Sequence, residues 1–231
     1  MPELPALQIA IDGPAASGKT TVARLLAHRL NVPYLDTGAM YRALSYLAVR
    51  TRTDADNAAA LVRLAGAHPL GVVRSADGAA YAIRVDDRTM TDEELQSNDV
   101  TAVVSTVAAH AAVRALMVAA QRQAADDAEV VMAGRDIGTV VLPSAPVKIF
   151  LTASVGARVA RRRAQLERAG VLGDVHLLSA EIEERDRLDR ERPVSPLVPA
   201  DDAYVLDSSD LTAEEVVERI CSVADAAGYG R

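Results

Sequence analysis

A glycine-rich loop between an apolar run and an amphipathic segment constrains the fold of this chain more than any other feature. Residues 13–20 read Gly-Pro-Ala-Ala-Ser-Gly-Lys-Thr, a complete G-x-x-x-x-G-K-[ST] pattern. The apolar run 7–11 before the loop is typical of a buried strand, and apolar residues at 22, 25 and 26 have helical spacing. Such a strand, loop and helix surround an anion with backbone N–H groups and the positive end of a helix dipole. A chance match in a flexible loop does not explain both flanks, so we predict nucleoside triphosphate binding.

The residue types in the loop fit this chemistry. Gly13 and Gly18 permit backbone torsions and a close approach that a side chain would block. Lys19 can reach the outer phosphates, and the Thr20 hydroxyl can ligate a Mg²⁺ ion that bridges them. The predicted nucleotide-binding residues are Gly13, Pro14, Ala15, Ala16, Ser17, Gly18, Lys19, Thr20 and Thr21.

Composition excludes several other classes of function. The formal net charge of −7 argues against a general binder of nucleic acid or anionic membranes. The single Cys221 excludes an internal disulfide, and the four histidines lack metal-site spacing. We recognise no signal peptide and no apolar stretch long enough to cross a bilayer, and we expect a soluble cytoplasmic protein.

Short apolar runs alternate with helical patterns along the chain. We expect strands near 7–11, 33–35, 129–133, 147–151 and 204–206. We expect helices over 19–30, 38–50, 92–125, 155–169, 178–192 and 212–226. This alternation predicts an α/β fold in three layers, with a five-stranded parallel sheet covered by helices on both faces.

One segment departs from this alternation. Residues 71–74 and 81–85 are predicted to form a hairpin with a turn at Asp77-Gly78, and residues 86–91 could add a third strand. The Ala-rich stretch 53–68 is predicted to be a helix. We therefore expect a small antiparallel insert between the second core strand and the long helix.

Charged residues follow two of the predicted strands. Ligands of open parallel sheets bind at the carboxyl ends of strands, so Asp36 and Arg42 should face the same crevice as the loop. There Asp36 could orient Mg²⁺ and Arg42 could meet a second anion, although a helix cap followed by a surface arginine is the better reading of this turn alone. Arg135 and Asp136 end another strand, where an arginine suits a phosphate and a structural salt bridge is the alternative.

Two helical segments are rich in arginine. Arg158, Arg161, Arg162 and Arg163 lie within two turns, and either a transferred phosphoryl group or solvent could compensate their charge. Arg185, Asp189 and Arg192 share one helical face further on. Spacing alone favours a solvated salt-bridge ladder for this second set over a ligand-facing strip.

Together these motifs resemble the bacterial cytidylate kinases over nearly the whole chain. The matching stretches are the loop (Ile11 to Thr21), D-T-G-A-x-Y-R (Asp36 to Arg42), G-R-D-x-G-T with its continuation (Gly134 to Leu151), the arginines from Arg158 to Arg162, and E-R-D-x-x-D-x-x-R (Glu184 to Arg192). The chain departs from the family at Ala133, usually acidic, at Ala157, usually Glu, and at Thr37, where many members have Ser.

The resemblance implies a role for each ambiguous group of residues. Arg42, Arg135 and Arg185 would surround the acceptor phosphate, and Ser105, Arg114, Asp189 and Arg192 would contact cytosine. Thr37 and Asp136 would lie near the nucleoside, with Asp136 at the ribose. A helical lid at about 154–173 would bring Arg158, Arg161 and Arg162 over the transferred phosphoryl group, beside the catalytic Lys19. The insert, at about 38–105, would bind the monophosphate within a single kinase domain, 1–231.

The resemblance implies ATP-dependent phosphorylation of CMP and dCMP. The loop pattern and the strand end predict that Thr20 and Asp36 hold the Mg²⁺ ion. The expected partners are small molecules only, neither nucleic acid nor membrane, and the protein is expected to be a monomer. A kinase for UMP or AMP would use the same phosphate chemistry, and Arg114, Asp189 and Arg192 argue against it. A regulatory ATPase would give no reason for a second phosphate site at Arg42, Arg135 and Arg185.

Overall fold

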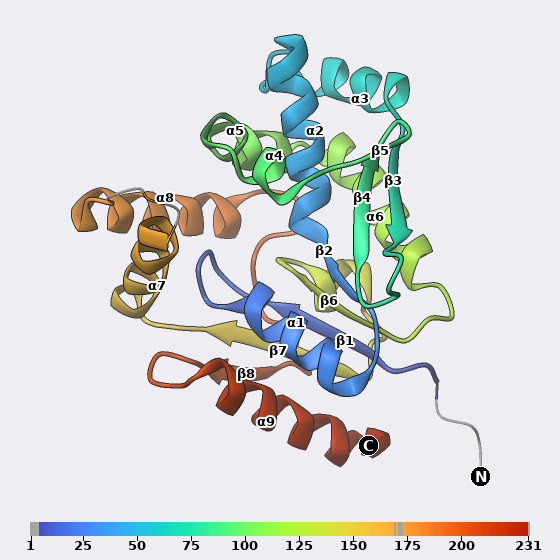
Figure 1. Ribbon diagram of the computed structural model, residues 1–231, viewed down its shortest axis with the longest axis vertical. Coiled ribbons are helices and arrows are strands. Elements are labelled where there is room, and N and C mark those ends of the chain that lie inside the picture. The colour runs from blue at the N-terminus through green and yellow to red at the C-terminus, as the bar shows by residue number, and fades with distance from the viewer. Residues whose placement is uncertain (1–4, 169, 171–172, 231) are drawn as a thin grey trace.

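The computed structural model describes residues 5–168, 170 and 173–230, and its central element is a five-stranded parallel sheet (Figure 1). The strands are β1 (Gln8–Asp12), β2 (Tyr34–Asp36), β6 (Val130–Gly134), β7 (Val147–Thr152) and β8 (Tyr204–Asp207). Their spatial order is β2-β6-β1-β7-β8, and every neighbouring pair is parallel. This confirms the predicted α/β sheet.

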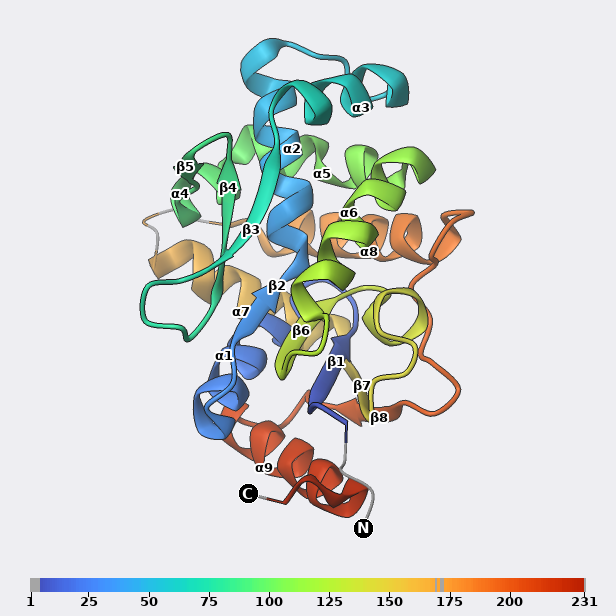
Figure 2. The same cartoon turned by 90° about the vertical axis from the view of Figure 1, so that its right-hand side faces the viewer.

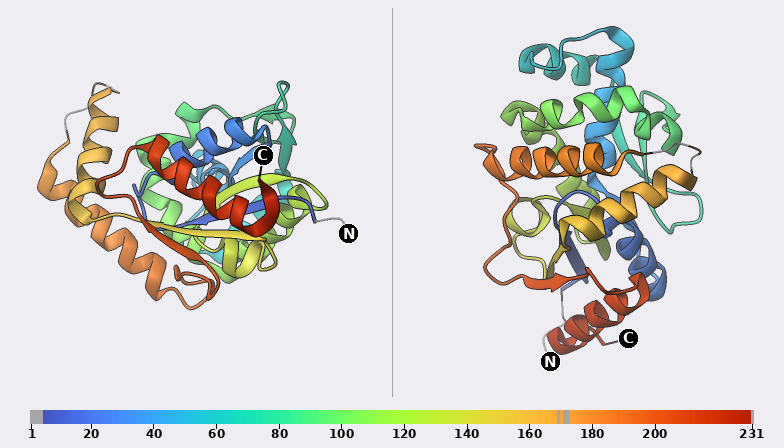
Figure 3. Two further views of the ribbon diagram at one scale, coloured as in Figure 1. Left: turned by 90° about the horizontal axis from the view of Figure 1, so that it is seen from below. Right: turned by 90° about the vertical axis from the view of Figure 1, so that its left-hand side faces the viewer.

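Successive residues of the central strand face different cores. Ile9 and Ile11 of β1 belong to a cluster formed with α1 (Lys19–Leu30) and α9 (Ala213–Ala224), which pack side by side in Figure 3. Ala10 belongs to a second cluster that includes α2 (Thr37–Thr51), α5 (Asn98–Ala109) and α6 (Ala111–Ala125). Because strand side chains alternate between the faces of a sheet, the two clusters give three layers.

The antiparallel insert is also present. It contains β3 (Leu70–Arg74), β4 (Tyr81–Val85) and β5 (Arg88–Thr89), preceded by α3 (Ala58–Ala67), and Figure 2 shows β3 and β4 alongside α2. The third strand is only two residues long. The backbone N–H of Tyr34 donates to the Ala79 carbonyl at 3.2 Å, which ties the insert to the edge of the main sheet.

The helix predicted over 92–125 is wrong as one element. It is three helices, α4 (Asp92–Gln96), α5 and α6, because Ser97 and His110 have extended backbones. The His110 ring lies 2.8 Å from the Ala55 carbonyl, a tertiary contact at the second break. The apolar periodicity continues through both breaks, so it does not reveal them.

Among the described residues no single helix is long and apolar enough to span a membrane. Helices α5 and α6 reach that length and apolarity only as a pair, which is bent by 96°.

The C-terminal half adds two elements beside the phosphate loop. Helix α7 (Val155–Arg168) follows β7, and α8 (Val175–Glu191) begins three residues before the predicted 178, where the Asp174 carboxylate caps it. Figure 3 shows the two helices packed together. Val159, Leu178 and Ile182 form the buried apolar cluster between them. Residues 169, 171 and 172 of the predicted lid lie outside the described residues. A π-helical turn, η1 (Ile137–Val141), was not predicted, and a second, η2 (Asp225–Tyr229), follows α9.

Candidate active site

The predicted phosphate loop joins β1 to α1. A Cβ atom at Gly13, where φ is +153°, would lie 2.0 Å from the Leu151 carbonyl oxygen, so only glycine fits between the two strands. Gly18 has φ +95° and forms the N-cap of α1, which leaves backbone N–H groups of the first helical turn directed at the loop. This geometry confirms the strand, loop and helix that the pattern predicts, and it can hold an anion.

Lys19 is buried beneath the loop. Its side chain donates to the Pro14 carbonyl at 2.6 Å and to the Ser17 hydroxyl at 3.3 Å. Burial lowers the pKa of Lys19 well below its usual range, and the nearby positive charge of Arg135 adds to the effect. A phosphate bound at the loop would favour the charged ammonium group, so the lysine is suited to a polyanionic ligand.

Of the three arginines predicted to hold a second phosphate, Arg135 and Arg42 lie close enough to Arg185 for their charges to affect its pKa. Arg42 lies 3.4 Å from Asp36, and Arg135 donates to Asp189 at 2.7 Å. The buried Nε of Arg185 has no hydrogen-bond partner among the described residues. Burial and the positive charges of Arg135, Arg42 and Arg162 together lower the pKa of Arg185 to about 10, although the charge of Asp189 opposes the shift. Arg185 is half-buried, and a guanidinium with an unpartnered buried nitrogen and this surplus of positive neighbours is suited to an anion.

The acidic and basic residues of α8 divide into two sets. Glu184, Arg187 and Glu191 form exposed ion pairs at 2.6 to 2.7 Å. The side chains of Asp189 and Arg192 are only 13% and 5% exposed, with 3.6 Å between them. The preference for solvated surface is therefore wrong for this second set, because its face is turned toward Arg135 rather than toward water.

Arg114 and Asp136 form a buried ion pair. Arg114 also donates to the Ala108 carbonyl at 3.1 Å, and its guanidinium lies 5.3 Å from the ring centre of Tyr41. Thr37 donates its hydroxyl to the Ala133 carbonyl at 2.9 Å. Ser105 is half-buried on α5, a helix that contacts α8. Several of the predicted nucleoside contacts are thus held in place by protein partners.

Helix α7 contacts the phosphate loop through two arginines. Arg158 donates to the carbonyls of Ala15 and Ala153, both at 3.1 Å, and is buried. Arg161 donates to the Ser17 carbonyl at 3.1 Å and to the Ser208 hydroxyl at 3.0 Å. Arg162 donates to Gln165 at 3.0 Å and is electrostatically coupled to Arg185. Arginines of this helix therefore contact the loop, and one of them lies close enough to Arg185 to affect its pKa.

Sequence reasoning assigned no role to Asp186. Its carboxylate accepts from Arg158 at 2.6 Å, and both side chains are at least nine-tenths buried. The pair joins α8 to α7 and, through Arg158, to the loop. The residue stands inside the E-R-D motif, but its spacing does not distinguish a surface aspartate from a buried one.

Asp12 was missed as well. It ends β1 directly before the loop and is 5% exposed, and its two oxygens accept from the backbone N–H groups of Ile137 and Gly138, each at 2.7 Å. Burial raises the pKa of Asp12 to about 6, although the two N–H donors oppose the shift. The sequence signal that could have identified Asp12 is a charged residue at the end of an otherwise apolar strand.

This shift predicts an unusual pH dependence of stability. Between about pH 4 and pH 6 the folded protein holds a proton on Asp12 more readily than the unfolded chain, so this residue's contribution to the free energy of unfolding falls as pH rises. The full effect is at most about 3 kcal/mol. Denaturant unfolding of the wild type and of Asp12→Asn at several pH values from 4 to 7 measures this effect. The free energy of unfolding of the wild type, relative to that of Asp12→Asn, should fall as pH rises. A difference that stays constant with pH would contradict the shifted pKa.

The residues at the loop are compatible with Mg²⁺. Thr20 exposes its side chain at the start of α1, and a hydroxyl combined with phosphate oxygens and water is a donor set that Mg²⁺ accepts. The oxygens of Asp36 are engaged by the Gly38 N–H at 3.0 Å and by Arg42. No group of three or more His, Cys, Asp or Glu that could hold a metal occurs in the described part of the chain. The fit therefore rests on Thr20, and the role of Asp36 stays a prediction.

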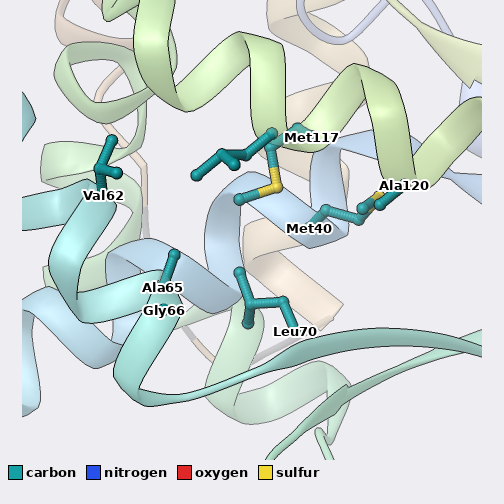
Figure 4. A pocket seen from close by; sticks show the side chains of 8 residues that line it. Met40, Val62, Ala65, Gly66, Leu70, Met117 and Ala120 are labelled. Carbon is teal, nitrogen blue, oxygen red and sulfur yellow. The ribbon is translucent and has the colours of Figure 1, made fainter.

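An apolar cavity of about 340 Å³ lies elsewhere, between α2, α3, α6 and β3 (Figure 4). The side chains labelled in the figure include Met40, Val62, Leu70 and Met117. Such a lining offers no charged partner for a phosphate. The groups suited to anions lie instead at the loop, at the end of β6 and on one face of α8, where two anions could be held side by side.

Comparison with known proteins identifies relatives along nearly the full length. The model of the family described as "Cytidylate kinase" matches residues 9–226. A protein named cytidylate kinase from Enterococcus faecalis is 48% identical over 223 residues, which cover 96% of this chain and 97% of the relative. A cytidylate kinase from Geobacillus is 46% identical, with 95% and 96% covered.

A solved structure supports the fold. The crystal structure of an uncharacterized protein from Eubacterium ventriosum superposes with a TM-score of 0.52 at 14% identity, covering 95% of this chain and 98% of the other. At this identity the likeness concerns the fold alone.

Proposed function

The chain belongs to the cytidylate kinase family, and from this membership we propose that it transfers the γ-phosphoryl group of ATP to CMP and dCMP. The observation that most supports the proposal is the cluster of Arg42, Arg135 and Arg185 beside Lys19, with a buried guanidinium nitrogen that has no partner in the described part of the chain. A second phosphate site next to the loop is what a monophosphate acceptor requires.

Phosphoryl transfer here needs positioning and charge neutralisation rather than a covalent nucleophile. The attacking atom is a phosphate oxygen of CMP, which is already anionic, so no general base has to remove a proton from it. We assign the acceptor phosphate to Arg42, Arg135 and Arg185, and the transferred group to Lys19 and to the lid arginines Arg158, Arg161 and Arg162. Arg158, already bonded to Ala15, would also hold the loop in place while closure of 154–173 excludes water.

Mg²⁺ would be held by the Thr20 hydroxyl together with the phosphates, and Asp36 is the proposed residue for orienting its waters. When bound, the ion neutralises charge on the β- and γ-phosphate oxygens. We further propose a cytoplasmic monomer that uses no nucleic acid or membrane partner, organised as one kinase domain with its insert at 38–105.

Base recognition is assigned to Ser105, Arg114, Asp189 and Arg192, and the ribose to Asp136, with Thr37 close by. A carboxylate can accept from the cytosine amino group, whereas the carbonyl of uracil at that position would meet a negative charge. The neighbouring Arg135 and Arg192 keep the pKa of Asp189 below its usual range even though burial opposes this, so the carboxylate stays ionised at neutral pH.

Asp189→Ala is expected to lower the preference for CMP over UMP by about 10- to 100-fold in kcat/KM, because the variant lacks the acceptor that distinguishes the two bases. Steady-state rates with each nucleotide measure the ratio. Glu191→Ala, which removes an exposed carboxylate two residues away, should leave the ratio unchanged. An equal loss with CMP and UMP in Asp189→Ala would make Asp189 a structural partner of Arg135 only.

A coupled assay of ADP release tests the proposed function. Purified protein with ATP and Mg²⁺ is offered CMP, dCMP, UMP, AMP and GMP separately, and once no acceptor. Release that depends on CMP or dCMP supports the proposal. Release with UMP or AMP alone would identify another monophosphate kinase, and equal slow release without any acceptor would identify a regulatory ATPase.

A further inference from the structure

Asp12 stands where the donor and acceptor halves of the site meet. It is the residue before Gly13 of the phosphate loop, and in the parallel ladder between β1 and β6 it lies opposite Gly134, directly before Arg135 and Asp136. No nucleotide contact is assigned to it. Its carboxylate nevertheless accepts two hydrogen bonds from a turn 125 residues away in the chain.

The turn that Asp12 contacts lacks a cap of its own. In a helical turn the first backbone N–H groups have no partner within the turn, and the side chain of the N-cap residue commonly accepts from them. The N-cap of η1 is Asp136, a residue type suited to that task, but its side chain makes no capping hydrogen bond. The carboxylate of Asp136 pairs with Arg114 instead.

We propose that Asp12 is a positioning residue that caps η1 in place of Asp136 and thereby leaves the Asp136 carboxylate free to hold Arg114 and the nucleoside. Without Asp12, the N–H groups of Ile137 and Gly138 would be buried and unpartnered. The carboxylate of Asp136 is the nearest acceptor along the chain, and turning inward to them would release Arg114. This inference rests on the proposed function, since it explains how the acceptor site is held in shape.

Local packing leaves little room for another arrangement. A Cβ atom at Gly138 would lie 3.4 Å from an oxygen of Asp12 and 3.3 Å from the Lys148 side chain, and one at Gly134 would lie 2.5 Å from the Thr37 hydroxyl. The backbone around Asp136 is thus enclosed on both sides. The phosphate loop, in contrast, is held by the β1 ladder and by the contact of Gly13 with Leu151, neither of which uses the Asp12 carboxylate. Loss of that carboxylate should therefore affect CMP more than ATP.

The test compares KM for CMP, KM for ATP, kcat and melting temperature in Asp12→Ala, Asp12→Asn, Asp136→Ala and the double variant Asp12→Ala/Asp136→Ala. In Asp12→Ala the KM for CMP should rise on the order of tenfold or more while the KM for ATP changes by less than about threefold. Asp12→Asn should recover part of the loss, since its amide oxygen still accepts one N–H. In the double variant, the substitution of Asp136 should raise the KM for CMP little beyond its value in Asp12→Ala, because the Asp136 carboxylate no longer pairs with Arg114 once Asp12 is removed.

Thr212→Ala serves as the control, because Thr212 caps α9 outside the site and its loss lowers stability alone. If Asp12→Ala behaves like this control, with a lower melting temperature and an unchanged KM for CMP, Asp12 only stabilises the fold and the inference is wrong. Equal rises in the KM for CMP and the KM for ATP would also overturn the inference. So would a double variant whose rise in KM for CMP equals the product of the rises in the two single variants. If Asp12→Ala does not fold, the same KM and melting-temperature comparisons are made with Asp12→Asn and with the double variant Asp12→Asn/Asp136→Ala. Absence of CMP phosphorylation in the wild type would instead refute the proposed function itself.

Discussion

Lys19→Met is expected to lower kcat with CMP about 100- to 1,000-fold while the folded protein, free of nucleotide, is as stable as the wild type or more so. The loss in rate follows from removing a cation preorganised against the charge of the transferred phosphoryl group. The stability follows from burial, because the ammonium of Lys19 is held in surroundings that lower its pKa, and methionine fills similar volume without that charge.

Steady-state kinetics and thermal melting without nucleotide measure the two effects separately. Lys148→Met is the matched control, since Lys148 is the only other lysine of the chain and is also buried. It bonds to Asp202 at 2.7 Å and to the Pro143 carbonyl at 2.6 Å, so its loss should lower stability and change turnover far less. Unchanged turnover in Lys19→Met would remove the loop lysine from the mechanism.

Asp186→Ala is expected to lower the melting temperature by about 10 °C. Breaking a buried ion pair by removing one partner typically costs about 3–5 kcal/mol, since the other charge stays buried, and a domain of this size shifts by about 2–4 °C per kcal/mol. Arg158 would be left with only carbonyl partners, among them Ala15 of the phosphate loop. Turnover should therefore fall as well.

Calorimetry or thermal denaturation followed by circular dichroism measures this change. Glu184→Ala on the same helix removes an exposed carboxylate that pairs with Arg187, and its melting temperature should stay within about 2 °C of the wild type. If the two variants melted alike, the Arg158–Asp186 pair would not contribute to the coupling of α7, α8 and the loop.

Much of the fold was predictable because local signals and tertiary structure agree. The loop pattern requires a strand before Gly13 and a helix after it, and the alternation of apolar runs predicts parallel strands covered on both faces. The Asp77-Gly78 turn likewise identified the hairpin of the insert. The breaks at Ser97 and His110 were missed because apolar periodicity continues across them while tertiary contacts decide where the backbone turns.

The candidate site was predictable as a set of residues but not as a set of partners. Spacing along α8 places Arg185, Asp189 and Arg192 on one face, yet it cannot say whether that face meets water or Arg135. The bonds that organise the site, Asp12 to η1 and Asp186 to Arg158, join residues far apart in the chain. The sequence marks Asp12 as a charge at the end of an apolar strand, but no local pattern identifies the partner of Asp12 or of Asp186, so only the folded structure shows these bonds.

The most direct test of the account follows a labelled γ-phosphoryl group from ATP. With Mg²⁺ and CMP, we expect the label to appear in CDP, with one ADP formed for each labelled CDP and little free phosphate. Label found only as inorganic phosphate, at a rate that CMP does not change, would show hydrolysis without transfer. It would contradict the claim that the arginines beside Lys19 hold an acceptor phosphate.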